Sequence, residues 1–165
     1  MDQLYLDNNM FVDNSNINTF ANGFMKLNYN LWQNLEGIKW YEKSKKYGKD
    51  ANEKVAEHLK ENYLLDDVIV LKNFAVEKRK ALQHTLIGYF KASPTCVRKE
   101  FTLSDDGLWD LTAHIVGMGE VMYTYVYDHP EIVLLMQKDY QENFEYGFDV
   151  AIYDLNNYDD NNLVS

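Results

Sequence analysis

The sequence predicts a mainly α protein, a compact bundle of about five or six helices with little or no sheet. Two runs of apolar residues support this prediction, one in residues 17–41 and one in residues 108–125. In both runs the apolar residues recur at steps of three and four, which places them on one side of a helix. The chain has 165 residues, 46% of them hydrophobic, which is enough for one domain with a core of its own.

The first part of the chain is expected to contain an arm and two helices. Residues 1–14 form the N-terminal arm. A long amphipathic helix follows over residues 17–47, with Gly37 as a candidate interruption and Gly48 as a natural stop. A short helix capped by Asp50 is then expected to run to about Tyr63. Its inward positions are Val55, Ala56 and Leu59.

Lysines gather near the end of the long helix. They suit a helix C-terminus, where the helix dipole is negative. A nucleic-acid patch is the alternative interpretation, but the acidic residues elsewhere in the chain argue against it, and no direct nucleic-acid binding is expected. The lysines are Lys39, Lys43, Lys45, Lys46 and Lys49.

A helix over residues 66–90 comes next, and Pro94 is expected to end it because proline cannot continue a helix. Residues 94–103 form a connector with a short extended piece. The core candidates of the helix again follow steps of three, four and seven. They are Val68, Leu71, Ala75, Leu82, Leu86 and Phe90.

The stretch over residues 104–127 has the densest apolar pattern in the chain. Ser104 or Asp105 is expected to begin its helix, because a side-chain oxygen there can accept a free backbone N–H of the first turn. Gly117 and Gly119 each cost roughly 1 kcal/mol in a helix interior, so they are expected to allow close approach of another helix or to mark a kink. The apolar stripe consists of Leu108, Leu111, Ile115, Met118, Met122 and Tyr125.

The end of this stretch, over residues 121–127, is rich in β-branched and aromatic residues and also fits an alternating strand. The helix is favoured because the stripe continues through the segment. Tyr123, Tyr125 and Tyr127 cannot all face the core of one helix. At least one of them is therefore expected to be exposed or to bind a partner.

The last part of the chain is expected to be helical and then flexible. A turn at residues 128–131 leads into another helix, with proline suited to the first position. A final helix or extended element spans residues 144–155. Residues 1–155 are thus predicted to form a single helical domain, and residues 156–165 a flexible acidic tail.

The run SDDGLWDLTAHIVGMGEVMYTYVYDHPE resembles the core of a bacterial family, the domain of unknown function numbered 4240. The likeness covers about residues 66–155 and departs at residues 93–96, Ser-Pro-Thr-Cys, where the family has a Trp-rich and Gly-rich link. The resemblance implies a helical fold and a bacterial origin, and it implies no mechanism. The family pattern has a Ser-Asp-Asp opening, an aromatic residue a few positions on, a Gly before an acidic or basic pair and an Asp-Pro turn. In this chain these features fall on Ser104, Asp105, Asp106, Trp109, Gly119, Glu120 and residues 128–130.

The net charge of −10 is unevenly distributed. Residues 104–165 contain 13 acidic residues and one basic residue, for −12, whereas residues 1–103 contain 13 acidic and 15 basic residues, for +2. Such a negative region repels nucleic acid and attracts cationic protein surfaces. Solubility alone is the alternative explanation.

No catalytic residue, metal site or cofactor is predicted. None of the four histidines is paired at the spacing of a zinc-binding helix, and Cys96 is the single cysteine. Ser104, Asp105 and Asp106 with Glu120 form a candidate carboxylate site, but a helix cap with solvated acids is the favoured interpretation.

Three hypotheses follow for the function. The first is a non-enzymatic acidic protein that neutralises a basic protein partner, such as an immunity protein or an inhibitor of a nucleic-acid enzyme. The second is an enzyme or small-ligand-binding domain with a pocket near residues 104–110, and the third is a structural or oligomeric module. The residues expected to bind the partner are Asp105, Asp106, Trp109, Glu120, Tyr123, Tyr127, Asp128 and Glu131.

The sequence favours the cytoplasm. The N-terminal residues are acidic and lack the basic and apolar pattern of a signal peptide. No apolar run is long enough to span a membrane. Cys96 has no second cysteine for an internal disulfide and is interpreted as a small hydrophobic residue.

Overall fold

The computed structural model of the chain describes residues 27–28, 30–140 and 143–162. The predicted N-terminal arm lies outside these residues. Within them the protein is mainly α, and no strand is present, so the predicted fold class is confirmed. The helices are α1 (Leu31–Gly37), α2 (Trp40–Tyr47), α3 (Ala51–Asn62), α4 (Leu65–Ala92), α5 (Thr95–Glu100), α6 (Asp105–Gly117), α7 (Glu120–Asp128), α8 (Val133–Met136) and α9 (Glu145–Asn162), with 3₁₀ turns η2 (Gly48–Asp50) and η3 (Pro130–Ile132).

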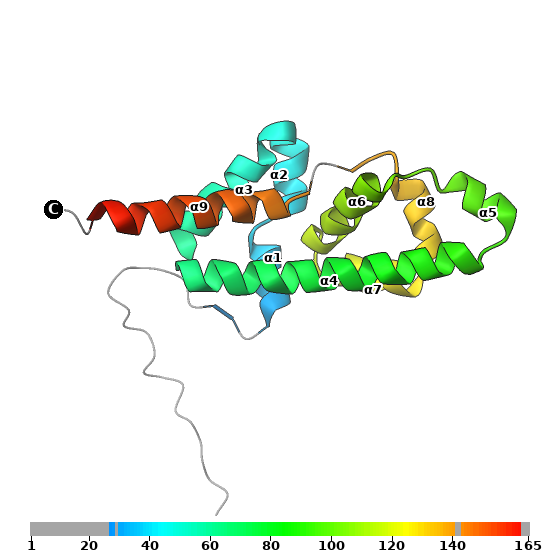
Figure 1. Cartoon of the computed structure of the whole chain (residues 1–165), viewed down its shortest axis with the longest axis horizontal. Coiled ribbons are helices and arrows are strands. Elements are labelled where there is room, and N and C mark those ends of the chain that lie inside the picture. The colour runs from blue at the N-terminus through cyan, green and yellow to red at the C-terminus, as the bar shows by residue number, and fades with distance from the viewer. Residues whose placement is uncertain (1–26, 29, 141–142, 163–165) are drawn as a thin grey trace, which may run out of the picture.

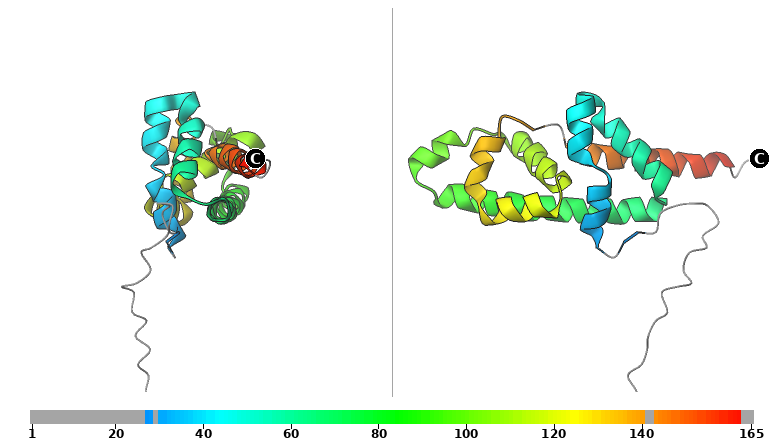
Figure 2. Two further views of the ribbon diagram at one scale, coloured as in Figure 1. Left: turned by 90° about the vertical axis from the view of Figure 1, so that its left-hand side faces the viewer. Right: turned by 180° about the vertical axis from the view of Figure 1, so that it is seen from behind.

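Helix α4 runs along the long axis of the molecule (Figure 1). Its 28 residues correspond to about 42 Å of helix at a rise of about 1.5 Å per residue. The first half of α4 packs against α1 and α9, and the second half packs against α6 and α7. Helices α1 and α7 lie behind α4 in Figure 1 and in front of it in the rear view of Figure 2.

The core has two clusters, one around each half of α4. The first joins α1, α2, α3, α9 and the end of α6 to the first half of α4 and includes Trp32, Trp40, Tyr63, Phe144 and Phe148. The second joins α6, α7 and α8 to the second half. Every core candidate named for α3 and α4 is buried, because both helices follow the predicted apolar stripe.

The long helix predicted over residues 17–47 is broken. Residues 17–26 lie outside the described part of the chain, and the rest forms α1 and α2, which are separated at Ile38 and Lys39. Lys39 has the left-handed backbone conformation, with φ 57°. The break buries Ile38 and Trp40 on either side of the corner, which a continuous helix would place 200° apart around its axis at about 100° per residue.

The helix predicted over residues 104–127 is also broken, into α6 and α7. Gly119 lies between them with φ 101°, a conformation that side chains with a Cβ rarely adopt. The turn changes the helical phase, so Met118 and Met122 are only partly buried and Tyr125 is exposed, contrary to the stripe prediction. Gly117 allows the close approach of another helix, since a Cβ there would lie 2.4 Å from Cδ1 of Trp40.

Three local features differ from the sequence prediction. Residues 95–100 form the short helix α5 rather than an extended piece. Asp50 precedes α3, but its side chain makes no capping hydrogen bond. The last element is a helix and continues to Asn162, so residues 156–162 are helical rather than part of a structureless tail. In the described part of the chain, no helix is both long enough and apolar enough to cross a membrane.

Candidate functional site

The residues predicted to bind a partner fall into two groups. Asp105, Asp106 and Trp109 lie in the first turns of α6. Glu120, Tyr123, Tyr127 and Asp128 lie on α7, and Glu131 lies in η3. The 13 residues of α6, or about 20 Å of helix, separate Asp105 and Asp106 from Glu120, so these acids do not share one site.

The opening of α6 is a helix cap. The Ser104 hydroxyl accepts a hydrogen bond from the backbone N–H of Gly107 at 3.1 Å, as predicted for the first residue of this helix. Asp105 and Asp106 are exposed in the first turn, where their charge suits the positive end of the helix dipole. Glu120 begins the next helix, so the carboxylate site considered for these residues is not formed.

One face of the Trp109 ring packs on a buried ion pair. The ring lies over the guanidinium of Arg79, with the central carbon 3.7 Å from the ring centroid. Arg79 donates to Glu145 at 2.8 Å, and both side chains are buried. A second hydrogen bond joins Arg79 to Gln83 at 2.8 Å. The indole is thus immobilised by a cation–π contact while 44% of the residue remains exposed.

A hollow of about 350 Å³ lies beside the exposed side of Trp109. Asp106, Trp109 and Asp110 of α6 line it together with Tyr146 of α9. Two carboxylates and two aromatic rings form a surface suited to an organic cation, since carboxylates attract the charge and ring faces attract it further. The sequence analysis did not predict Arg79, Glu145 or Tyr146 as residues of a site.

The outer side of α7 exposes both apolar and acidic residues. We call this surface the α7 face; its residues are Glu120, Val121, Tyr125, Tyr127, Asp128 and, from η3, Glu131. Val121 is 84% exposed and Tyr125 50%, and their spacing of four puts them side by side on the helix. Tyr125 packs against His129 with ring centroids 5.0 Å apart.

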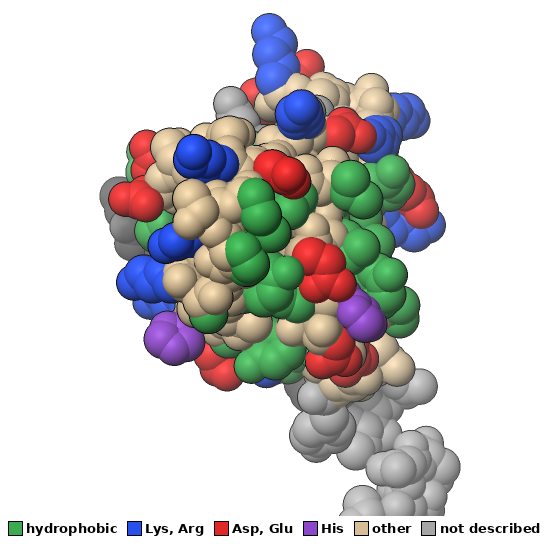
Figure 3. Space-filling model, turned by 90° about the vertical axis from the view of Figure 1, so that its right-hand side faces the viewer, with side chains coloured by type: hydrophobic (Ala, Val, Ile, Leu, Met, Phe, Trp, Pro, Cys, Tyr) green, Lys and Arg blue, Asp and Glu red, His purple; other side chains and the backbone are tan. Residues whose placement is uncertain are grey.

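Tyr123 lies at the inner edge of α7, beside Tyr127, with ring centroids 5.9 Å apart. Its ring packs against Trp32 of α1, with centroids 5.0 Å apart, and burial raises the pKa of its hydroxyl. Tyr125 and Tyr127 are exposed, which confirms that the three tyrosines do not all face the core. In Figure 3, which faces the α5 end of the molecule, the hydrophobic side chains on the α7 and α8 side lie among acidic ones.

Several acidic residues of the second half of the chain are paired with basic residues of the first half. Each pair joins a side chain of α9, or of the loop that precedes it, to α2, α3 or α4. Part of the charge separation seen in the sequence is therefore neutralised inside the molecule. The pairs are Lys45–Asp139 at 3.3 Å, Lys60–Asp154 at 2.5 Å, Arg79–Glu145 at 2.8 Å, and Lys72–Asp149.

The acids of the α7 face differ from this paired set. Glu120 and Asp128 are exposed and have no ion pair with a described residue, and Glu131 lies 3.7 Å from a histidine, His129. The same is true of Asp105 and Asp106. These carboxylates keep their charge available to another molecule.

The buried histidine of α6 has a structural role. His114 accepts a hydrogen bond at Nδ1 from Nε1 of Trp40 at 3.0 Å. Burial, aided by Lys45, lowers its pKa from 6.5 to about 4, so the ring is neutral near pH 7. Among the described residues, no group of three or more His, Cys, Asp or Glu side chains could hold a metal ion.

Comparisons with protein-family models, with curated proteins and with solved structures found no match to this chain. The resemblance to domain of unknown function 4240 therefore stays a prediction. The function has to be argued from the surface itself.

Proposed function

We propose that this protein is a non-enzymatic binding protein that neutralises a basic protein partner by covering its cationic surface with the α7 face. One observation supports this above the others. The acids of the α7 face have no lysine or arginine partner among the described residues, whereas Asp139, Glu145, Asp149 and Asp154, of α9 and its preceding loop, are paired within the molecule. A cationic partner would supply the missing counter-charges.

The composition of the α7 face also suits a protein interface. Tyrosine is favoured in such interfaces because its large ring packs against a partner while its hydroxyl can form a hydrogen bond. Tyr125, Tyr127 and Val121 provide the apolar contact area. Glu120, Asp128 and Glu131 surround them and can each pair with Lys or Arg of the partner.

The mechanism is occlusion rather than chemistry. A surface that binds phosphate or an acidic substrate carries lysines and arginines, and carboxylates can occupy those positions in place of the ligand. An immunity protein against a toxin, or an inhibitor of a nucleic-acid enzyme, has this property. Aromatic side chains would then provide most of the affinity, and the acids would provide speed and selectivity.

The decisive experiment is a comparative pull-down from the native host. The full chain is used as bait beside a triple reversal on the α7 face, Glu120→Lys, Asp128→Lys and Glu131→Lys. A control with the same charge change, Glu53→Lys, Asp66→Lys and Glu100→Lys, reverses exposed acids of α3, α4 and α5. A stoichiometric basic protein should bind the parent and the control and should be lost with the α7 variant.

Two results would contradict the proposal. One is the absence of any stoichiometric cationic partner. The other is a partner that the α7 variant retains. Recovery of the chain alone, in the form of a defined oligomer, would favour the structural module instead.

A second candidate function rests on the hollow beside Trp109. Its carboxylates and aromatic rings fit a small organic cation such as an alkylguanidinium. Since Trp32 and Trp40 are buried and Trp109 is exposed, titration with an alkylguanidinium should quench the tryptophan fluorescence in a saturable way. The quenching should disappear in Trp109→Leu and weaken in Asp106→Asn; a linear, non-saturable response would exclude this site.

A further inference from the structure

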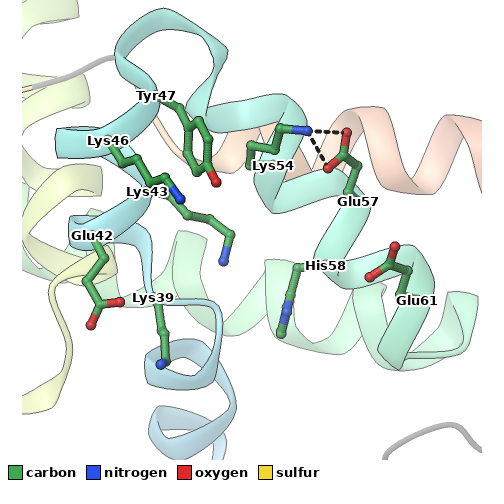
Figure 4. A pocket seen from close by; sticks show the side chains of 9 residues that line it. All are labelled: Lys39, Glu42, Lys43, Lys46, Tyr47, Lys54, Glu57, His58 and Glu61. Atoms are coloured by element: carbon green, nitrogen blue, oxygen red, sulfur yellow. Dashed lines mark hydrogen bonds and ion pairs between the residues drawn. The ribbon is translucent and has the colours of Figure 1, made fainter.

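A basic cleft lies between α2 and α3, on elements separate from the α7 face. Its volume is about 350 Å³, within the range of small-molecule sites. Figure 4 shows lysines of α2 on one wall and side chains of α3 on the other. The lining residues are Lys39, Glu42, Lys43, Lys46, Tyr47, Lys54, Glu57, His58 and Glu61.

Three lysines lie on the α2 side of the cleft. Lys43 and Lys46 are three residues apart on α2, which places them on one side of the helix, and Lys39, at the corner before α2, lines the same cleft. Like charges at this spacing destabilise a helix. None of the three has an ion pair with a described residue, although Lys45 on the same helix pairs with Asp139 and Lys54 on the facing helix pairs with Glu57.

Lys39 adopts a strained backbone conformation. With φ 57° it is the single non-glycine residue with positive φ in the described part of the chain. Left-handed backbone disfavours a residue with a Cβ atom, and glycine or asparagine is the usual choice. A corner that keeps lysine despite this strain points to a use for its side chain, since strain of this kind gathers at functional sites.

Lys43 is fixed in position. Its side chain is partly buried, and Nζ donates to the backbone carbonyl of Ile38 at 2.5 Å. An ammonium group has three N–H donors. Two of them therefore remain for a ligand after this bond is made.

His58, on the α3 wall, adds a further donor. The amide nitrogen of Asn62 donates to the His58 carbonyl at 2.7 Å and lies 3.5 Å from Nδ1; in the tautomer in which Nδ1 also accepts from it, the ring proton is on Nε2. Nε2 is buried and has no hydrogen-bond partner among the described residues. A buried donor without a partner destabilises the protein, and a turn of the ring that brings Nε2 to the cleft, where a ligand oxygen or a water molecule can accept its proton, would relieve this.

The three glutamates narrow the class of ligand. Glu57 is neutralised by Lys54, with both carboxylate oxygens 2.7 Å from the ammonium. Glu57 and Glu61 lie on the α3 side, across the cleft from the lysines of α2 (Figure 4). A long polyanion such as a nucleic acid would meet these acids and the rest of an acidic protein. A small anion can lie against the lysine wall and avoid Glu57 and Glu61, while Glu42, which lies on the same side as the lysines, offsets part of their charge.

We propose that the cleft between α2 and α3 binds the phosphate group of a small molecule, with Lys39, Lys43 and Lys46 as its counter-charges and His58 as a neutral donor. Lysine binds phosphate through charge-assisted hydrogen bonds. The phosphate comes either from an inorganic ion or from a nucleotide. The Tyr47 ring, which also lines the cleft, offers a surface on which a base can stack.

The test is calorimetric titration of the full chain with pyrophosphate, with ATP and with adenosine. Saturable binding of pyrophosphate and ATP with similar affinity assigns the site to phosphate alone. Much tighter binding of ATP assigns it to a nucleotide. Either result supports the proposal, provided that adenosine binds more weakly than ATP and that binding shifts the imidazole NMR signals of His58.

Variants separate a functional role from a structural one. Lys39→Asn removes a charge but suits left-handed backbone, so its unfolding midpoint should not fall below that of the parent while its affinity drops about tenfold or more. Lys43→Gln and Lys46→Gln should weaken binding similarly. Lys49→Gln removes the same charge from η2, outside the lining of the cleft, and should leave the affinity nearly unchanged.

Three outcomes would overturn the proposal. The first is no saturable binding of pyrophosphate or ATP at millimolar concentration. The second is adenosine binding as tightly as ATP, since the phosphate would then be irrelevant. The third is Lys49→Gln weakening binding as much as the cleft variants, which would indicate a diffuse attraction to the lysines of α2 and η2.

Discussion

At the scale of single residues, two buried polar contacts connect helices that are far apart in the sequence. Arg79 of α4 pairs with Glu145 of α9, and Trp40 of α2 donates to His114 of α6. Neither contact was predicted from the sequence, because periodicity indicates which side of a helix is buried but not which residues of other helices that side contacts. Arg79 does follow the α4 stripe, four residues after Ala75 and three before Leu82. A charged residue on an apolar stripe could have been recognised as one that needs a buried partner.

The Trp40–His114 contact predicts acid sensitivity. His114 has a pKa of about 4 when folded and 6.5 in its ordinary state. Between these values the unfolded chain binds more protons, so stability falls as the pH is lowered from about 6.5 towards about 4, by at most about 1.4 kcal/mol per pH unit. Denaturant unfolding at several pH values in this window measures the slope.

The matched control for this prediction is His114→Asn. Its side-chain oxygen can replace Nδ1 as the acceptor for Trp40 and does not titrate. Other groups also gain protons in this window, so the informative quantity is the difference between the two proteins. Equal slopes for the parent and the variant would contradict the assigned role of His114.

At the scale of elements, the sequence predicted those helices whose burial follows one uninterrupted stripe. Helices α3 and α4 are of this kind, and so is α6 up to Ile115. Prediction failed where the backbone turns. The chain changes direction at Gly119 and at Lys39. These turns accompany the packing of Trp40 against α6, a contact between helices that are far apart in the sequence, and periodicity within one helix cannot predict such a contact. The α2 lysines were interpreted as a helix end because the facing helix was unknown.

Gly117 provides a test of this packing. Alanine is favoured over glycine in a helix interior by roughly 0.5–1 kcal/mol, but here its Cβ would overlap the indole of Trp40 at 2.4 Å. Because the crowded ring is itself buried, Gly117→Ala should destabilise the protein by about 1–3 kcal/mol. Thermal unfolding followed by circular dichroism gives the change.

Gly88 is the control for Gly117. It lies in α4, and a Cβ built there meets nothing within 4 Å. Gly88→Ala should therefore stabilise the protein by roughly 0.5–1 kcal/mol. If the two substitutions have the same sign, the close approach of Trp40 to α6 is wrong.

At the scale of the whole molecule, the separation of charge along the sequence has two consequences. The lysines of α2, α3 and α4 hold the acidic helix α9 and its preceding loop by surface ion pairs, each worth about 0–1 kcal/mol. The acids of α7 and η3 are left without lysine or arginine partners in the described structure. The count of charges in the sequence predicted a negative second half but could not show which acids are neutralised, because that depends on which helices lie side by side. Among the predicted partner-binding residues, Tyr123 is partly buried. The others are all exposed: Asp105, Asp106, Trp109, Glu120, Tyr127, Asp128 and Glu131.

The difference between the paired acids of α9 and its preceding loop and the acids of the α7 face, which lack lysine or arginine partners in the described structure, predicts how association with the basic partner depends on salt. The Debye length shrinks from about 30 Å at 0.01 M to about 8 Å at 0.15 M ionic strength, so the association rate should fall over this range if the exposed acids steer the encounter. Reversal of Glu120, Asp128 and Glu131 should lower the rate and flatten its salt dependence, measured by stopped-flow mixing with the partner recovered in the pull-down. Reversal of Asp139, whose charge already faces Lys45, should change the association rate far less than reversal of any one acid of the α7 face. An association rate that ignores salt, or that responds equally to Asp139→Lys and Asp128→Lys, would show that net charge rather than the α7 face attracts the partner.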